Sequence, residues 1–406
     1  MPPGPDPGAD AMDDLARSRG AGMSGGTAMP LAPLAAATDP GTVEVFAHPD
    51  ALPADVQGFM HEAEKRNVGL GLCWYRNLVA AVYADDPGVR FYVLRNKGQV
   101  RAVMPLRAEK ERLGWRLTSL SNFYTSLYEP VLAPGVTAAG LLPLLSALNR
   151  EFRPLSSLML APMDAGGEAY RTLLGAMRLK GWLPFEYFSF GNWYLPVSFD
   201  WNKYLAQRSS TQRNTIRRMG KKFANDGGVL EIVTGPDDLP GAIEAYERVY
   251  AASWKKPEPF PAFVPGLVQS CAAKGYLRLG LAWLGGEPVA AQVWIVAHGR
   301  AEIYKVAYDE KFKAYSPGTL VTALLMQHVI DVDKVGEVDY LIGEDPYKKT
   351  WMSHRRDRRG IIAYNPRALS GLAGLARESA GRLVKAVRAW LHSDQPGGGA
   401  GTPPHS

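Results

Sequence analysis

One short segment of the sequence, GEDPYKKTW at residues 343–351, combines acids, a phenol and amines that could move protons. It follows an apolar strand pattern, and loops that leave a strand end in an α/β sheet often line an active crevice. It contains two carboxylates, Glu344 and Asp345, and one phenol, Tyr347. A solvated charged turn with Trp351 in the core would fit the same residues.

A second segment, YSPGT at residues 315–319, opens a predicted helix. Proline suits the first helical turn because its missing N–H is not needed there, and Ser316 could cap the helix. Gly318 leaves neighbouring N–H groups accessible, and with the helix dipole these form a generic phosphate site. Lys311 and Lys313 lie just upstream and add positive charge. An ordinary capped helix start would fit the same pattern.

Basic residues gather at residues 208–222, where Arg213, Arg217 and Lys221 form one stripe of a predicted helix. The run HRRDRRG at residues 354–360 adds a second basic patch. The stripe is either a solvated face or a grip on an anionic ligand such as CoA phosphates, a nucleotide or an acidic glycan. Neither segment alternates with aromatic residues, and the formal net charge is only +6 over 406 residues, so we expect no DNA partner.

Several kinds of site are not indicated by the sequence. The seven histidines form no ligand pair at i, i+4, and the two cysteines, Cys73 and Cys271, form no CxxC motif. We therefore expect neither a metal site nor a disulfide framework. No uncharged apolar run is long enough for a membrane-spanning helix, and no signal peptide is recognised, so we expect a cytoplasmic protein.

The middle of the chain contains one pattern of elements twice. In the first copy the pattern predicts strands at 91–95, 100–107 and 115–120, a helix at 137–150 and a strand at 155–160. In the second copy it predicts strands at 277–283, 288–297 and 301–308, a helix at 317–332 and a strand at 337–342. Helical segments precede each copy, at 55–66 in the first and at 209–225 and 239–252 in the second. The sequence therefore predicts a tandem α+β protein with two mixed-sheet copies.

The two ends of the chain differ from this middle part. Residues 1–42 are rich in Pro and Gly, and residues 394–406 share that composition, so we expect both segments to be disordered. Residues 366–393 predict a basic amphipathic helix. Such a helix either packs on the body of the protein or contacts a membrane surface or a partner.

Several segments of the sequence resemble a known family. The runs IYKVAYDEKFKAYSPGTLV and VDYLIGEDPYKKTW are similar to the C-terminal half of the CelD/BcsL-like acetyltransferases, in the GNAT superfamily of acyl-CoA N-acyltransferases. The segments SSTQRNTIRRMGKK and NFYTSLYEPVL fit the same family, and the resemblance covers about residues 43–365. It implies a tandem GNAT-like fold, with a degenerate copy at 43–195 and an acyltransferase copy at 196–365.

The resemblance also implies how a donor would bind. Acetyl-CoA or another acyl-CoA would be the co-substrate, with its pyrophosphate at residues 316–319 and its thioester near a backbone N–H of the third strand. The residues expected to bind it are Lys305, Val306, Ala307, Lys313, Tyr315, Ser316, Pro317, Gly318 and Thr319. The usual superfamily fingerprint, Arg/Gln-x-x-Gly-x-Gly/Ala, is absent, and residues 313–318 stand in its place.

Chemical roles follow from the same resemblance. Glu344 or Asp309 would act as base towards the acceptor, which would be an amine or hydroxyl of a small molecule or glycan precursor, and Tyr347 would act as acid. A crevice between the copies would hold the acceptor, or the same residues would only pack the interface. The side chains expected there are Asn122, Tyr124, Tyr128, Lys348 and Trp351.

Two other functions fit the same residues. FemAB-like transferases use the double fold with aminoacyl-tRNA as donor, and the basic stripe at Arg213–Lys222 would suit tRNA. A non-catalytic accessory protein of exopolysaccharide or cellulose biosynthesis would explain the missing fingerprint. Salt-sensitive tRNA binding would distinguish the first alternative from an acyl-CoA-dependent enzyme, and absence of any CoA binding would support the second.

Overall fold

The chain folds as two series of elements in the same order. The computed structural model describes residues 41–393, with side chains up to Arg382. Each series runs strand, two helices, three strands, helix, strand, helix, strand, so the prediction of a repeated α+β fold with mixed sheets is confirmed. The end segments expected to be disordered lie outside the described residues, apart from Gly41 and Thr42.

The bounds of the elements are as follows. The first series consists of β1 (Thr42–Phe46), α1 (Ala54–Glu64), α2 (Leu72–Val82), β2 (Val89–Asn96), β3 (Gln99–Glu111), β4 (Gly114–Ser119), the short β5 (Val131–Leu132), α3 (Leu142–Glu151), β6 (Leu155–Asp164), α4 (Glu168–Leu179) and β7 (Leu183–Pro196). The second consists of β8 (Val229–Val233), α7 (Leu239–Ala251), α8 (Phe263–Ala273), β9 (Leu277–Leu284), β10 (Glu287–Ala297), β11 (Arg300–Tyr308), α9 (Pro317–Asp331), β12 (Glu337–Asp339), α10 (Lys348–Trp351) and β13 (His354–Tyr364). Helices α5 (Trp201–Ala206) and α6 (Ser210–Asn225) connect the series, and α11 (Leu369–Ser393) follows them.

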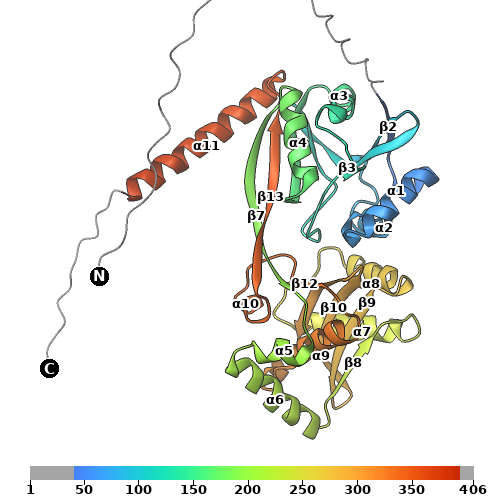
Figure 1. Ribbon diagram of the computed structural model, residues 1–406, viewed down its shortest axis with the longest axis vertical. Coiled ribbons are helices and arrows are strands. Elements are labelled where there is room, and N and C mark those ends of the chain that lie inside the picture. Colours follow the sequence, from blue (N-terminus) through green and yellow to red (C-terminus); the bar gives the residue numbers. More distant parts are fainter. Residues whose placement is uncertain (1–40, 394–406) are drawn as a thin grey trace, which may run out of the picture. The chain divides into compact units, whose positions relative to one another are not determined.

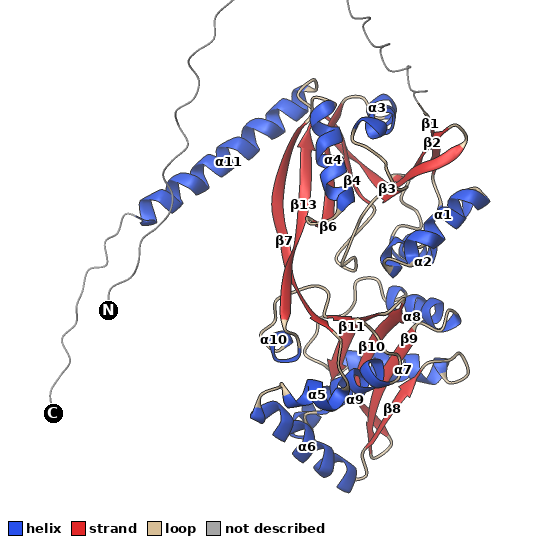
Figure 2. Ribbon diagram, viewed as in Figure 1, coloured by secondary structure: helices blue, strands red, loops and turns tan. Residues whose placement is uncertain are grey.

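The strands of both series join one sheet (Figure 2). Its order is β1-β2-β3-β4-β6-β13-β7-β12-β11-β10-β9-β8, and β5 pairs with β3. The first four strands of each series are antiparallel neighbours, and the fourth pairs in parallel with the strand after the crossover helix, β4 with β6 and β11 with β12. This is the mixed sheet with a crossover that the sequence predicts.

The last strands of the two series are exchanged at the centre of this sheet. Strand β13 belongs to the second series but lies between β6 and β7 of the first. Strand β7 in turn pairs with β12 of the second series through Tyr194–Pro196. The two long strands lie side by side from the pair Leu183–Tyr364 to the pair Tyr194–His354 (Figure 1). Each series therefore completes the sheet of the other, across the boundary expected between residues 195 and 196.

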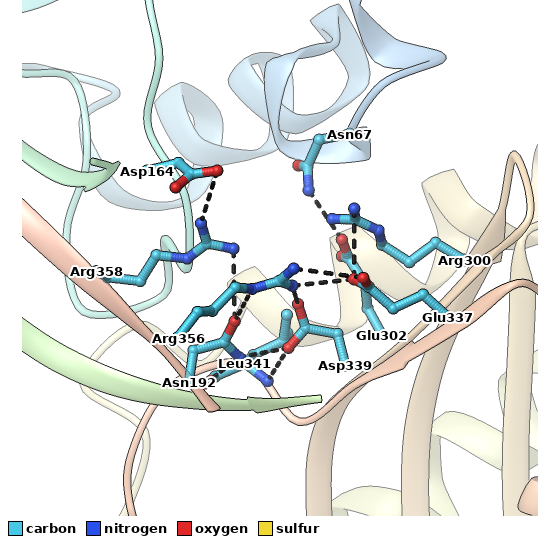
Figure 3. A network of polar contacts seen from close by, with 10 residues as sticks. All are labelled: Asn67, Asp164, Asn192, Arg300, Glu302, Glu337, Asp339, Leu341, Arg356 and Arg358. Carbon is cyan, nitrogen blue, oxygen red and sulfur yellow. Dashed lines mark hydrogen bonds and ion pairs between the residues drawn. The ribbon is translucent and has the colours of Figure 1, made fainter. Parts of the chain in front are cut away.

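This exchange corrects the expectation of a basic surface patch at 354–360. The segment is strand β13, and two of its arginines point into a polar network beside the exchanged strands (Figure 3). Arg356 donates to Asn192 of β7 at 2.6 Å and pairs with Glu337 at 2.9 Å and with Asp339. Buried Arg358 lies 3.7 Å from Asp164. These charges are used inside the fold rather than offered to a ligand.

The hydrophobic core is shared by the two series. Buried side chains of α1 and α2 belong to the same cluster as those of α7 and α8. The ring centroids of Trp74 and Phe263 lie 5.6 Å apart, and those of Tyr124 and Phe263 lie 4.0 Å apart in a parallel stack. Because aromatic pairs of this kind contribute beyond their buried area, they fix the first series against the second.

Local boundaries follow the sequence where turn residues set them. Both central residues of the turns at Lys97–Gly98 and Gly285–Gly286 have positive φ, as tight hairpins require. The predicted helix at 137–150 begins later, at Leu142, after a 3₁₀ turn over Ala139–Leu141. The predicted strand at 337–342 ends at Asp339, because Leu341 has a φ of 54° and leaves the ladder.

The basic helix predicted at 366–393 is present as α11. Its beginning is attached to the body, since the hydroxyls of Ser156 and Ser370 are 2.5 Å apart. Arg382 donates to the carbonyl of Glu186 at 2.8 Å. Within the part of the chain that the structure describes, no helix is both long and apolar enough to cross a membrane.

Candidate active site

The candidate site lies where β11 and β12 part. These parallel strands are paired only over Arg300–Glu302 with Glu337–Asp339, whereas β11 stays paired with β10 as far as Tyr308. The N–H of Asp309 donates to the carbonyl of Val289 in β10, so alternation along β11 turns the N–H groups of Val306 and Tyr308 towards the opposite edge. That edge has lost its partner strand and borders a cavity.

The larger cavity has a volume of about 690 Å³. One wall is the free edge of β11, and the other walls come from the start of α9, one face of α6 and the loop after β12. The lining side chains and backbone include Ser209, Gln212, Thr215, Trp254, Val306, Ala307, Tyr308, Lys313, Ser316, Pro317, Gly318, Thr319, Asp345, Tyr347 and Trp351. Most of the residues expected to bind the donor are thereby brought together.

The start of α9 presents a free backbone donor to this cavity. Ser316 occupies the N-cap position with φ 52° and ψ 45°, but its hydroxyl makes no capping hydrogen bond. The N–H groups of Thr319 and Leu320 already donate to the Ser316 carbonyl. Pro317 has no N–H, so Gly318 supplies the first available donor of the helix. The expectation that Ser316 caps the helix with its side chain is therefore wrong, and the helix end stays open to an anion.

A buried amide fixes this turn from below. Gln292 on β10 donates to the Gly318 carbonyl at 2.9 Å and to the Thr322 hydroxyl at 2.7 Å. The indole of Trp294 donates to the side-chain amide oxygen of Gln292 at 3.0 Å. Every polar atom of this buried side chain is thus used to hold α9 against the sheet. Hydrogen bonds from a buried side chain therefore fix the position at which α9 begins.

A smaller cavity of about 220 Å³ adjoins the larger one. The two share Val306, Tyr340, Asp345 and Tyr347. The remaining walls of the smaller cavity come from both series and are Phe123, Tyr124, Lys255, Ile303, Tyr304, Lys305, Leu341, Ile342 and Lys348. A molecule in one cavity would therefore meet a molecule in the other beside Val306 and Tyr347.

Two titratable side chains stand at this junction. Partial burial of the Tyr347 ring, with the nearby Asp345 carboxylate, raises the pKa of the phenol to about 12. The phenol therefore keeps its proton at neutral pH. Asp345 lies 3.4 Å from the ammonium of Lys348 and is more than half exposed. Lys348 itself is buried and also donates to the carbonyls of Tyr340 and Ile342, which holds the loop in place.

The structure places several predicted site residues elsewhere. The carboxylate of Glu344 is paired with Arg355 at 2.5 Å, and Glu344 lines neither cavity. Asp309 caps the 3₁₀ turn before α9 by accepting from the N–H of Lys311 at 2.9 Å. The phenol of Tyr315 donates to Asp226 at 2.8 Å. The geometry does not support a role as base for Glu344 or Asp309.

The residues expected to bind an acceptor also separate. Tyr124 lines the smaller cavity, and Trp351 lines the larger one. Asn122 lines a different hollow of about 360 Å³ that touches the smaller cavity through Phe123 and Ile342. Tyr128 is fully buried and donates to the Pro105 carbonyl at 2.9 Å, so it is a core residue.

Three lining residues were not found by sequence reasoning. Gln212 on α6 faces the larger cavity, and neither polar atom of its buried amide has a partner among the described residues. Trp254 and Lys255 follow α7 and line one cavity each. A signal existed in the run SWKKPEP at 253–259, where aromatic and basic residues follow a helix, but only the fold brings it to β11.

Comparisons with known proteins agree with this architecture. Residues 210–349 match the model of the acetyltransferase (GNAT) domain family. A conserved protein of unknown function from Bacteroides thetaiotaomicron is 12% identical, with 80% of this chain and 100% of that chain covered at a TM-score of 0.53. FemX is 11% identical, with 68% of this chain and 87% of that chain covered at a TM-score of 0.50. A tandem GNAT protein from the clavulanic acid biosynthesis pathway is 13% identical, with 80% and 99% covered at 0.43. No match was found among curated protein sequences.

These findings bear on the fold and on one part of the chain. The tandem GNAT-like fold is confirmed, and residues 210–349 of the second series match the acetyltransferase (GNAT) domain family. Such a domain supports an acyl-transfer role. The likeness to the CelD/BcsL-like subfamily stays a prediction.

Proposed function

We propose that the protein transfers an acyl group from acyl-CoA to an amine or hydroxyl acceptor at the junction of the two cavities. The observation that carries this proposal is the junction itself. The larger cavity begins at the open N-terminus of α9 and ends at Val306 and Tyr347, where the smaller cavity opens. A donor and an acceptor can therefore approach one another without either crossing the protein.

The larger cavity has the features that CoA requires. The N-terminus of α9, with the free N–H of Gly318 and the positive end of the helix dipole, suits a pyrophosphate, and Lys313 adds positive charge at the same wall. The free edge of β11 can hydrogen-bond an extended pantetheine chain as a neighbouring strand would. The N–H of Val306 would then face the thioester oxygen and stabilise the charge that develops on it.

The reaction needs two proton movements at the junction. The acceptor enters as an ammonium, which loses one proton to Asp345, directly or through water, and from there to solvent. The resulting free amine attacks the thioester carbonyl carbon. A C–N bond forms and the C–S bond breaks, and Tyr347 gives its proton to the departing thiolate. The second proton of the amine nitrogen restores the phenol, so the products are an amide and free CoA. A hydroxyl acceptor has a single proton, which passes to Asp345 as the C–O bond forms, and Asp345 then returns it to the Tyr347 phenolate.

The two series would divide the work. We assign the donor site to the second, at 196–365, and one wall of the acceptor site to the first, at 43–195, through Phe123 and Tyr124. The CelD/BcsL-like resemblance favours a small-molecule or glycan precursor as acceptor and acetyl as the acyl group.

Thermal unfolding of the full chain tests donor binding. Acetyl-CoA at 100 times its dissociation constant should stabilise the fold by about 2.7 kcal/mol, and free CoA should also raise the midpoint. Thr319→Glu, which puts a carboxylate at the open helix end, should abolish the shift. Ala54→Glu adds the same charge to the start of α1, far from the cavities, and should retain it. No shift with any CoA species would exclude an acyl-CoA donor.

One feature favours a second candidate, transfer from aminoacyl-tRNA. One face of α6 lines the larger cavity, and Arg213, Arg217 and Lys221 are exposed on the same helix. A tRNA whose acceptor end enters the cavity would meet these charges. Salt-dependent tRNA binding that Arg217→Gln weakens, with no CoA binding, would favour this candidate.

A further inference from the structure

One lysine of the smaller cavity makes no hydrogen bond or ion pair through its ammonium with the residues that the structure describes. Three ammonium groups line this cavity, those of Lys255, Lys305 and Lys348. Glu258 pairs with Lys305 at 2.5 Å and accepts from the Tyr124 phenol at 2.5 Å. Lys348 is held by backbone carbonyls and lies 3.4 Å from Asp345. Among the described residues, Lys255 has no hydrogen bond or ion pair from its ammonium.

The ammonium of Lys255 is partly buried, which makes its charge costly. It lies 5.7 Å from the ring centroid of Tyr250 and 5.8 Å from that of Trp254, and these cation–π contacts offset part of that cost. Burial and the nearby Lys305 ammonium lower the pKa of Lys255 to about 8, although Glu258 and Asp345 act in the opposite direction. An anion in the cavity would remove this cost, because an opposite charge favours the ammonium form.

The position of Lys255 relates this charge to the proposed reaction. It lines the smaller cavity together with Val306, Asp345 and Tyr347, the residues at the junction with the larger cavity. The volume of about 220 Å³ suits a small molecule or the end of a larger one. The apolar part of the wall consists of Phe123, Tyr124 and Tyr304. Among the described lining residues, Lys255 is therefore the charged side chain that is available to pair with a ligand.

We propose that the acceptor carries an anionic group, a carboxylate or a phosphate, and that Lys255 binds it. The group would pair with the ammonium at one side of the smaller cavity, and the nucleophile would then face the junction. This inference rests on the proposed acyl transfer for the identity of the occupant. It makes Lys255 a specificity-determining residue, and neutral analogues of the acceptor should be poor substrates.

Chemical protection of the full chain tests the anion site without any transfer reaction. Reductive methylation with formaldehyde is followed at Lys255 and at its exposed neighbour Lys256 by fragment mass spectrometry. Inorganic phosphate or acetate, at ten times its dissociation constant, should slow methylation of Lys255 about tenfold and leave Lys256 unchanged. The anion that protects identifies the class of group. A methylation rate of Lys255 that neither anion changes would overturn the proposal, whether or not CoA binds.

Steady-state kinetics with paired acceptors then tests the role. Amino acids are compared with their amides, and amino sugar phosphates with the unphosphorylated sugars, using acetyl-CoA as donor. Lys255→Gln should raise KM for the anionic member of a pair about ten- to a hundredfold, with little change in kcat, and should leave the neutral member unchanged. Lys256→Gln should change neither. A loss of kcat that is equal for anionic and neutral acceptors would overturn recognition and make Lys255 part of the proton transfer.

Discussion

Two adjacent carboxylates of the same loop have different environments. Asp345 borders both cavities, whereas Glu344 is held by Arg355 and lies against Gly191, so that a Cβ on that glycine would come within 2.3 Å of the glutamate carboxyl. The pKa of Glu344 is lowered mainly by its hydrogen bond from Arg355. A carboxylate held ionised in this way, away from both cavities, is a poor proton acceptor for the proposed reaction.

Conservative substitutions separate these roles. Tyr347→Phe and Asp345→Asn should each lower kcat about a hundredfold, because each removes a proton-transfer group at the junction. Glu344→Gln is the matched control and should change kcat by less than about twofold. The measurement is acetyl-CoA turnover by thiol release, with circular dichroism to check the fold. A large loss in Glu344→Gln alone would show that the loop moves on binding and that the assignment of the base is wrong.

At the scale of elements, the site depends on how α9 lies against β9 and β10. Gly280 of β9 permits this close approach, since a Cβ there would come within 2.7 Å of the Val321 side chain and 2.8 Å of Leu325. Gln292 holds the first turn of the same helix. The open N-terminus therefore depends on packing well below the cavity.

A single methyl group at Gly280 tests this dependence. Gly280→Ala should lower the free energy of unfolding by about 1–3 kcal/mol, because the core would be overpacked, and should weaken CoA binding by displacing the start of α9. Gly241→Ala on α7 meets nothing within 4 Å and should be neutral or stabilising. Urea denaturation and titration with CoA measure both effects. Unchanged CoA affinity in a destabilised Gly280→Ala would refute the link between packing and site.

The predictable elements are those set by local residues. The hairpin at Gly285–Gly286 and the start of α9 at Pro317 are encoded by turn and cap chemistry, so the sequence predicts them and with them half of the donor site. The sequence of β13 is typical of a charged surface segment. Its Arg356 is paired with Glu337 and Asn192, and these partners come from distant segments that the sequence does not reveal. Gln212 and Lys255 were missed for the same reason, since only tertiary contacts bring them to β11.

At the scale of the whole described region, the exchanged strands tie the two series together through buried charges. Glu302 accepts from Asn67 of the first series at 3.0 Å (Figure 3). Burial, and then the Asp339 carboxylate, raise the pKa of Glu302 from 4.5 to about 7. Arg300 lies 3.4 Å from Glu337 in the same network. The junction of the series therefore contains an acid whose ionisation opposes folding.

This acid predicts a pH dependence of stability. The folded state binds the Glu302 proton more tightly than the unfolded state, so its contribution is fully present below pH 4.5 and is lost as the pH rises to about 7 and beyond. Glu302→Gln keeps an acceptor for Asn67. Between pH 5 and 8 the free energy of unfolding of this variant should fall less than that of the wild type, and the difference between the two falls should be up to a few kcal/mol. Glu62→Gln, at an exposed ion pair, is the control. Urea denaturation at each pH checks this, and parallel curves for Glu302→Gln and wild type would contradict it.

Hydrogen–deuterium exchange of the full chain with and without acetyl-CoA tests the central proposal most directly, because it reports where the donor binds. The proposal predicts slower exchange at residues 306–308 on the free edge of β11, at 316–320 at the start of α9 and at 345–351 in the loop after β12. Residues 89–119 of the first series should exchange at unchanged rates. Saturating acetyl-CoA that protects none of these three segments, or protects only the first series, would contradict the assignment of the larger cavity as the donor site.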